Sequence, residues 1–219
     1  NKNIIISLVV VAIIILGVAG IYLYGTDLQS TQQTSQSKTK GTVVLGVTDA
    51  ALSMGNVSSI LVTVNKVQIH SQTEGWVTIS DSIKQYDLLL LKQSGKIEML
   101  AKTDVNVGNY DQMRLNISKV VIVENGISSE AKLPSGELKI MGSVIVDSNS
   151  TATAVFDFIA DESLHKTGSA KFIFTPVIKV ETRRDADVQL KSNNEIKVSG
   201  GKVKTSQSVG MDINGEVKT

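Results

Sequence analysis

The sequence predicts a mainly β protein, in which an all-apolar N-terminal α-helix precedes an antiparallel β-sandwich with a short-stranded C-terminal extension. The segment Ile4–Tyr24 contains no charged residue. From Gly41 onward, short stretches of alternating apolar and polar residues are separated by turn-forming residues, which is typical of half-buried strands in a sandwich. Ser, Thr, Asn, Gly and Val are plentiful, and this composition suits strands and turns.

The first segment is long enough to cross a bilayer as a helix. About 20 apolar residues, each adding about 1.5 Å, give a length of about 30 Å. Apolar residues cover every face, so the helix must be buried all round, either in lipid or in a bundle of identical helices. Lys2 favours a membrane interface. Four small residues permit close helix packing: Ala12, Gly17, Ala19 and Gly20.

Composition divides the chain into four expected parts. Residues 1–25 form the apolar helix, and residues 26–40 form a polar linker rich in Ser, Thr and Gln. Residues 41–183 form the β-sandwich domain, and residues 184–219 form a β extension. The sequence starts at Asn1 without Met. We interpret this start either as an omitted Met or as a cut just before Asn1 that retains the apolar segment.

Two long strands are expected to contain β-bulges. Ile60, Val62 and Val64 alternate with polar residues, but the alternation resumes out of phase at Val67, which indicates a bulge near Asn65-Lys66. The segment from Met113 to Ile122 shows the same slip past Ser118-Lys119.

The remaining elements follow from shorter patterns. We expect strands at 42–47, 76–79, 137–146 and 152–158, and a strand at 172–180 that Pro176 weakens. Residues 86–91 fit a strand or a helical turn, and residues 96–102 fit a short helix. Asn125-Gly126 predicts a two-residue hairpin, and Pro134-Ser-Gly136 a turn. The tail is interpreted as a local hairpin, an added edge, a meander or a strand donated to a neighbouring molecule.

Charge and composition exclude several classes of function. The net charge is +1 with both signs scattered, so the chain lacks the basic footprint of a nucleic-acid-binding protein. It contains no Cys, which rules out disulfides and thiolate chemistry.

No catalytic, cofactor-binding or metal-binding motif is present, and we expect no enzyme activity and no cofactor. His70 and His165 lack ligand-spaced neighbours, and Asp185 and Asp187 beside Arg183-Arg184 are interpreted as a solvated charge cluster. The stretch from Asp104 to Gly108 begins like a calcium loop but then departs from that pattern. Three sequons make Asn56, Asn116 and Asn149 candidate N-glycosylation sites.

Motifs across residues 41–181 resemble those of the domain of unknown function 4382. They include Gly41-Thr-Val-Val-Leu-Gly-Val-Thr-Asp-Ala50, Gly75-Trp76, Tyr86-Asp-Leu88, Gly108-Asn-Tyr110-Asp-Gln-Met-Arg114-Leu and Pro176-Val-Ile-Lys-Val180. Ala51 departs from this pattern, because Pro is expected there. The resemblance implies a β-rich extracytoplasmic domain, common in archaea and some bacteria and often next to an anchor, and it supplies no site residues.

The apolar segment separately resembles the helices of archaeal type IV pilin-like proteins, although Ile5 stands where bacterial pilins usually carry an acidic residue. This resemblance implies a cell-surface filament of identical subunits, inserted in the membrane before assembly and involved in adhesion. The alternative is a single-span anchored extracytoplasmic domain that binds a glycan, a ligand or a partner protein.

Overall fold

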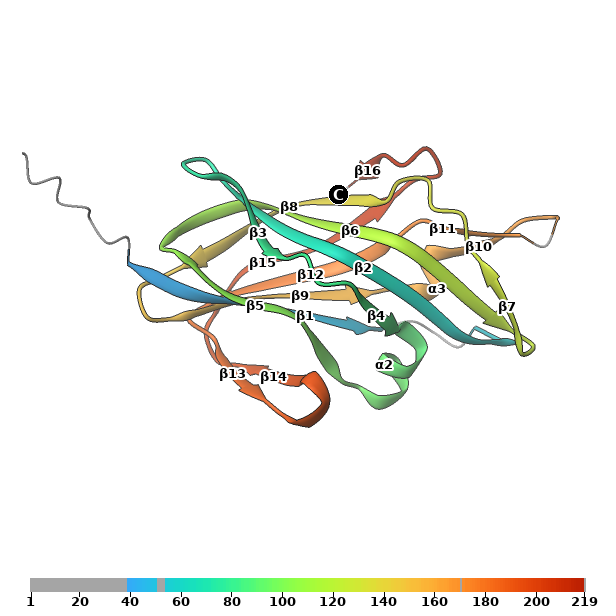
Figure 1. Cartoon of the computed structure of the whole chain (residues 1–219), viewed down its shortest axis with the longest axis horizontal. Helices are drawn as coiled ribbons and strands as arrows, with labels where there is room; N and C mark the ends of the chain where they lie inside the picture. The colour runs from blue at the N-terminus through green and yellow to red at the C-terminus, as the bar shows by residue number, and fades with distance from the viewer. Residues whose placement is uncertain (1–38, 51–53, 170, 219) are drawn as a thin grey trace, which may run out of the picture. The chain divides into compact units, whose positions relative to one another are not determined.

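The computed structural model describes residues 39–50, 54–169 and 171–218, which form one compact unit of mainly β structure (Figure 1). The predicted apolar helix, its packing residues Ala12, Gly17, Ala19 and Gly20, and most of the polar linker lie outside the described residues. Within the described ranges, no helix is long and apolar enough to cross a membrane.

The larger sheet has eight strands in the order β13, β14, β5, β1, β9, β12, β15, β16. In the same order, the bounds are Asp187–Leu190, Glu195–Ser199, Ile97–Asn106, Lys40–Asp49, Thr151–Phe158, Val177–Arg184, Lys202–Met211 and Val217–Lys218. The sheet departs from the expected antiparallel pattern at one place, because β1 and β9 pair in parallel. The chain between these two strands forms the second sheet and β5.

The smaller sheet is built on two long strands, β2 (Val57–Ser71) and β6 (Gly108–Glu124). β3 (Gly75–Ser80) and β4 (Lys84–Asp87) pair with β2, whereas β7 (Ile127–Glu130) and β8 (Glu137–Val146) pair with β6. A separate ribbon consists of β10 (Leu164–Lys166) and β11 (Phe172–Phe174). The described helices are α2 (Leu88–Ser94), α3 (Ala160–Ser163) and the 3-10 turn η1 (Ser192–Asn194).

The core lies between the two sheets. In Figure 1, β2 and β6 run diagonally across β9 and β12 of the larger sheet. Alternate residues of these strands point inward and lose contact with water, which is the main force that holds such a sandwich together. The largest fully buried side chains include Tyr110, Phe156, Phe158 and Phe174.

Both predicted bulges are confirmed, and they lie next to each other. The β2–β6 ladder pairs Thr63 with Lys119 and Lys66 with Asn116, and it leaves Asn65 and Ser118 unpaired between them. The predicted hairpin at Asn125-Gly126 is also confirmed, because both residues have positive φ angles, of 50° and 77°, as a type I′ turn requires.

The segment from Lys96 to Lys102 is not a helix, contrary to the prediction. Helix α2 instead precedes it: Asp87 caps its start through its side chain, and Gly95 ends it in the left-handed conformation. Strand β5 follows, and its residues from Glu98 onward pair with β1, whereas Ile97 pairs with Ile196 of β14. The β1 ladder satisfies the backbone of this segment, and this long-range pairing overrides its weak helical tendency. Pro176 separates β11 from β12, so the expected strand at 172–180 is divided in two.

The tail pairs with the larger sheet at two places. β15 adds to β12, and the β13–β14 hairpin joins the sheet through β5. Val44 of β1 is 2% exposed, and Ile196 of the hairpin is 3% exposed. The Ile196 side chain packs directly over Gly46.

Candidate binding surface

The outer face of the smaller sheet presents a row of side chains that crosses four strands. Trp76 on β3 lies opposite His70 on β2, His70 lies opposite Gln112 on β6, and Gln112 lies opposite Met141 on β8. Neighbouring strands are about 4.8 Å apart, so the row spans about 14 Å. Its neighbours Ile69, Met113 and Ile140 are fully buried and form part of the core. The row therefore faces away from the core.

Trp76, the single Trp of the chain, stacks on an arginine. The Arg114 guanidinium carbon lies 4.0 Å from the centre of the Trp76 ring, which is the geometry of a cation–π contact. The His70 ring lies 5.1 Å from the Trp76 ring at an angle of 58°. Arg114 Nε is buried and makes no hydrogen bond within the described part of the chain. The stack thus fixes Trp76 while its side chain stays partly exposed.

A carboxylate holds the histidine of this row in place. His70 Nδ1 lies 2.7 Å from Asp111 Oδ1, and Gln72 Nε2 donates to Asp111 Oδ2 over 3.4 Å. The hydrogen bond with His70 is the largest cause that lowers the pKa of Asp111 below its usual value, and the Gln72 bond acts in the same direction. Asp111 is therefore a carboxylate at neutral pH.

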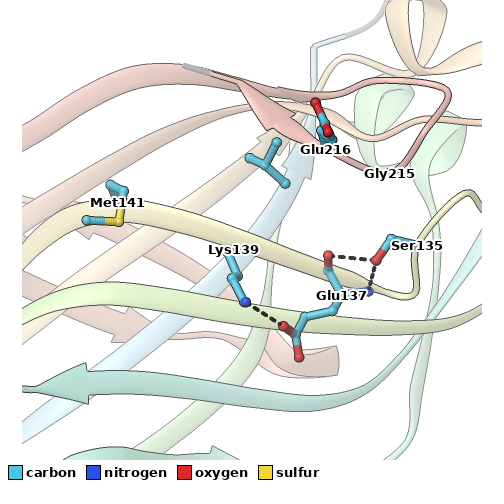
Figure 2. A pocket seen from close by; sticks show the side chains of 7 residues that line it. Ser135, Glu137, Lys139, Met141, Gly215 and Glu216 are labelled. Carbon is cyan, nitrogen blue, oxygen red and sulfur yellow. Dashed lines mark hydrogen bonds and ion pairs between the residues drawn. The ribbon is translucent and has the colours of Figure 1, made fainter.

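A chain of ion pairs continues from the arginine to strand β8. Arg114 Nη1 lies 3.3 Å from Glu137 Oε2, and Lys139 Nζ lies 3.4 Å from Glu137 Oε1. Ser135 fixes Glu137 from the backbone side, because the Glu137 N–H donates to Ser135 Oγ and the Ser135 hydroxyl donates to the Glu137 carbonyl. Figure 2 shows Glu137 held between Lys139 and Ser135.

Glu137 and Lys139 also line an open groove of about 530 Å³. The groove lies between β8 and the β15–β16 turn, as Figure 2 shows, and its lining residues are Ser135, Glu137, Lys139, Met141, Gly215, Glu216 and Val217. Asp212 organises the turn, because its Oδ1 accepts from the Asn214 and Glu216 N–H groups over 2.9 and 3.0 Å. These hydrogen bonds, with that from Lys218, hold the pKa of Asp212 below its usual value.

Side chains occupy much of the free edge of β8. The Gln207 amide donates to the Met141 carbonyl. The Ser143 N–H donates to Thr205 Oγ1 over 2.8 Å, and Thr182 Oγ1 donates to the Ser143 carbonyl over 2.7 Å. With Ser135 on Glu137, these bonds use the Glu137 and Ser143 backbone groups and the Met141 carbonyl, which a further strand would need. This edge is therefore poorly suited to the addition of a β-strand.

The other residues with catalytic or ligand chemistry are dispersed over the fold. His165 bonds to Thr175 through Nε2, away from His70. Asp104 accepts a hydrogen bond from Thr42, and Asn106 donates one to Glu74, so two polar side chains of the calcium-like stretch have protein partners. Across residues 39–50, 54–169 and 171–218, no group of three or more His, Asp or Glu side chains could hold a metal ion.

The three sequon asparagines differ in their surroundings. Asn56 lies in the exposed turn before β2, and Asn149 lies in the exposed turn before β9 with a φ angle of 54°. Asn116 lies within β6, and its side-chain oxygen is buried.

The cluster around Trp76 was not predicted from the sequence. Trp76, Arg114 and Glu137 lie on three different strands, and only the strand order brings them together. The sequence feature that could have indicated this cluster was Trp76, the single Trp of the chain, which lies in a short strand with weak apolar–polar alternation.

Comparison with known families gives one match. Residues 40–176, well over half of the chain, match the family described as Domain of unknown function (DUF4382). The match confirms the resemblance carried by the motifs from Gly41 onward. No curated protein and no solved structure matches the chain.

Proposed function

The chain belongs to the DUF4382 family, whose description assigns no activity. From the residues of this chain, we propose that the protein is a structural subunit of an extracellular filament similar to the type IV pili of archaea. The N-terminal segment forms the filament core, and the β domain forms its outer surface. The polymer consists of copies of this chain.

The observation that carries the proposal is the strongly apolar run Ile4–Tyr24, which contains no charged residue. Before assembly, a helix of this length matches the thickness of the hydrocarbon core of the lipid bilayer and can span it. During assembly it exchanges lipid contacts for contacts with identical helices, so it stays away from water throughout. Gly17 and Gly20 allow close approach between such helices.

The attachment of β1 supports a structural role. β1 starts at Lys40, the last residue of the predicted linker, and it pairs with β5 on one side and with β9 on the other. The Thr42 N–H donates to the Ser150 carbonyl over 2.9 Å, and the Asn149 N–H donates to the Lys40 carbonyl over 3.0 Å. A pull on the linker therefore acts on a central strand with hydrogen bonds along both edges, which resists detachment.

Electron microscopy of shed surface fibres tests this function with two matched variants. Gly17→Leu keeps the segment apolar but blocks close helix approach, so we expect membrane insertion without fibres. Val18→Leu adds bulk at the next position without removing a small residue, and it should still form fibres. The proposal is wrong if the native chain is found only as monomers in membrane fractions.

A second candidate function is favoured by the cluster around Trp76. In this alternative, the apolar segment is a permanent membrane anchor, and the β domain binds a glycan or another ligand outside the cell. The two functions are distinguished by fractionation, because the anchor predicts detergent-soluble monomers that show saturable binding.

A further inference from the structure

We propose that the outer face of the smaller sheet, from Trp76 to the groove beside β8, binds a neutral oligosaccharide. This inference rests on display of the domain outside the cell, which both candidate functions share. It requires neither assembly nor a particular anchor. Four side chains carry it: Trp76, Asp111, Arg114 and Glu137.

The aromatic component is Trp76. The faces of sugar rings carry C–H groups that pack on aromatic rings, and an indole offers a large contact area with little rotational freedom. Arg114 lies over one face of the indole, 4.0 Å from the ring centre, and holds it in one orientation, so a sugar ring packs on the part of the indole that Arg114 leaves exposed. Binding to a ring that is already fixed costs less conformational entropy than binding to a mobile one.

The polar component is a set of fixed donors and acceptors. Asp111 is held by His70 and Gln72, and Glu137 is held by Arg114, Lys139 and Ser135. Sugar hydroxyls both donate and accept hydrogen bonds, so they need neighbouring groups of both kinds. Carboxylates next to guanidinium, ammonium and amide groups supply them on this face.

The charge balance indicates a neutral ligand. The negative charges of Asp111 and Glu137 offset the positive charges of Arg114 and Lys139, and Glu216 in the groove adds a further negative charge. Both cations already contact Glu137, at 3.3 and 3.4 Å. An anionic ligand would have to compete with that carboxylate. A peptide that adds as a strand is disfavoured too, because Gln207, Thr205 and Ser135 occupy the β8 edge.

The dimensions indicate more than one sugar unit. The row from Trp76 to Met141 spans about 14 Å, as three strand spacings. Met141 is 55% exposed, and it also lines the groove of about 530 Å³ together with Glu216. A ligand that starts on Trp76 can therefore continue over Arg114 and end in the groove.

The test uses the full chain in detergent and its intrinsic fluorescence, because Trp76 is the single Trp. The probes are maltotriose and mannotriose as neutral trisaccharides and trigalacturonic acid as an acidic one. We expect a saturable change in emission with at least one neutral probe and a weaker response to the acidic probe. No change with either neutral probe, or a stronger response to the acidic probe, would overturn the proposal.

Calorimetry on variants locates the site. Trp76→Ala should weaken binding of the neutral probe at least tenfold, and Arg114→Lys should weaken it severalfold, because the planar stack is lost. The matched control is Arg183→Lys on the outer face of the larger sheet, where Arg183 pairs with Glu181. Unchanged binding by a folded Trp76→Ala variant would refute the site. Fibre formation by the same variant, checked by electron microscopy, separates this failure from a failure of the filament proposal.

Discussion

The ammonium group of Lys84 donates hydrogen bonds to the backbone carbonyls of Met99 and Leu100, over 3.2 and 3.1 Å. Lys84 belongs to β4 of the smaller sheet, whereas Met99 belongs to β5 of the larger one. The ladder between β1 and β5 leaves Leu100 unpaired at a bulge. Lys84 thus joins the two sheets where one of them is irregular, and the Tyr86 hydroxyl donates to the same Met99 carbonyl.

Replacing Lys84 with Met should destabilise the domain. The substitution keeps the apolar stem but removes two hydrogen bonds from a charged donor, and it leaves two carbonyls without that partner. We expect a loss of about 1.5–3 kcal/mol in the free energy of unfolding, measured by urea denaturation. Lys102→Met, at an exposed position on β5, is the control and should change the free energy by less than about 0.5 kcal/mol. Equal effects at the two positions would contradict the assigned role.

Gly41→Ala should be more damaging than Gly108→Ala. A Cβ atom at Gly41 would overlap the Asp147 carbonyl oxygen, and it would lie 2.6 Å from Val146 Cγ1. The backbone must shift to relieve such an overlap, which costs about 1–3 kcal/mol. A Cβ at Gly108 meets nothing within 4 Å. Thermal unfolding of both variants checks this, and similar midpoints for the two would contradict the predicted overlap.

Local signals in the sequence predicted the local parts of the fold. The bulges at Asn65 and Ser118 are visible as phase slips within single strands, and Asn125-Gly126 fixes its hairpin through two positive φ angles. Helix α2 is capped by Asp87 at its start and by Gly95 at its end, and the sequence pattern left residues 86–91 undecided between a strand and a helical turn. The prediction of a helix at Lys96–Lys102 was wrong because pairing with β1, more than 50 positions earlier in the chain, determines the strand conformation of this segment.

The candidate surface could not be predicted in the same way. Its contacts join Trp76 to Arg114 and Arg114 to Glu137, across strands whose order depends on long-range pairing. The parallel pairing of β1 with β9 is equally non-local. The chemical types of these residues were visible in the sequence, but their proximity was not.

Asp157→Asn should stabilise the domain at neutral pH. Burial raises the pKa of Asp157 above its usual value, and nearby Lys179 offsets this only in part. The folded state therefore binds a proton more readily than the unfolded chain, so the charged carboxylate costs stability above the folded-state pKa. The cost falls as the pH drops through that pKa and is absent below the unfolded-state pKa. Urea midpoints from pH 3 to pH 7 should separate wild type and variant only at the higher pH values.

Glycan occupancy should differ among the three sequons. Asn56 and Asn149 lie in exposed turns, whereas the side-chain oxygen of Asn116 is buried within β6. Mass spectrometry of glycopeptides from the native source should find sugar on Asn56 or Asn149 and none on Asn116. Asn149→Gln provides the control, because it should remove only its own glycopeptide. A modified Asn116 would contradict the burial seen here.

The two unpaired residues of the β2–β6 ladder should be removable together but not separately. Thr63 pairs with Lys119 and Lys66 pairs with Asn116, so both strands use the same number of residues between these pairs. Deleting Asn65 alone leaves an unmatched residue on β6, and deleting Ser118 alone leaves one on β2. Either deletion then requires a one-sided bulge or a register shift, and a shift turns buried residues outward.

Deleting both residues restores equal lengths. After the deletion of Asn65, one residue, Lys66, remains between Val64 and Val67, so both stay on the inner face. After the deletion of Ser118, one residue, Lys119, remains between Ile117 and Val120, so these also stay on the inner face. We therefore expect the double deletion to unfold at a higher urea concentration than either single deletion. If the effects of the two single deletions simply add, the bulges are independent and do not compensate each other.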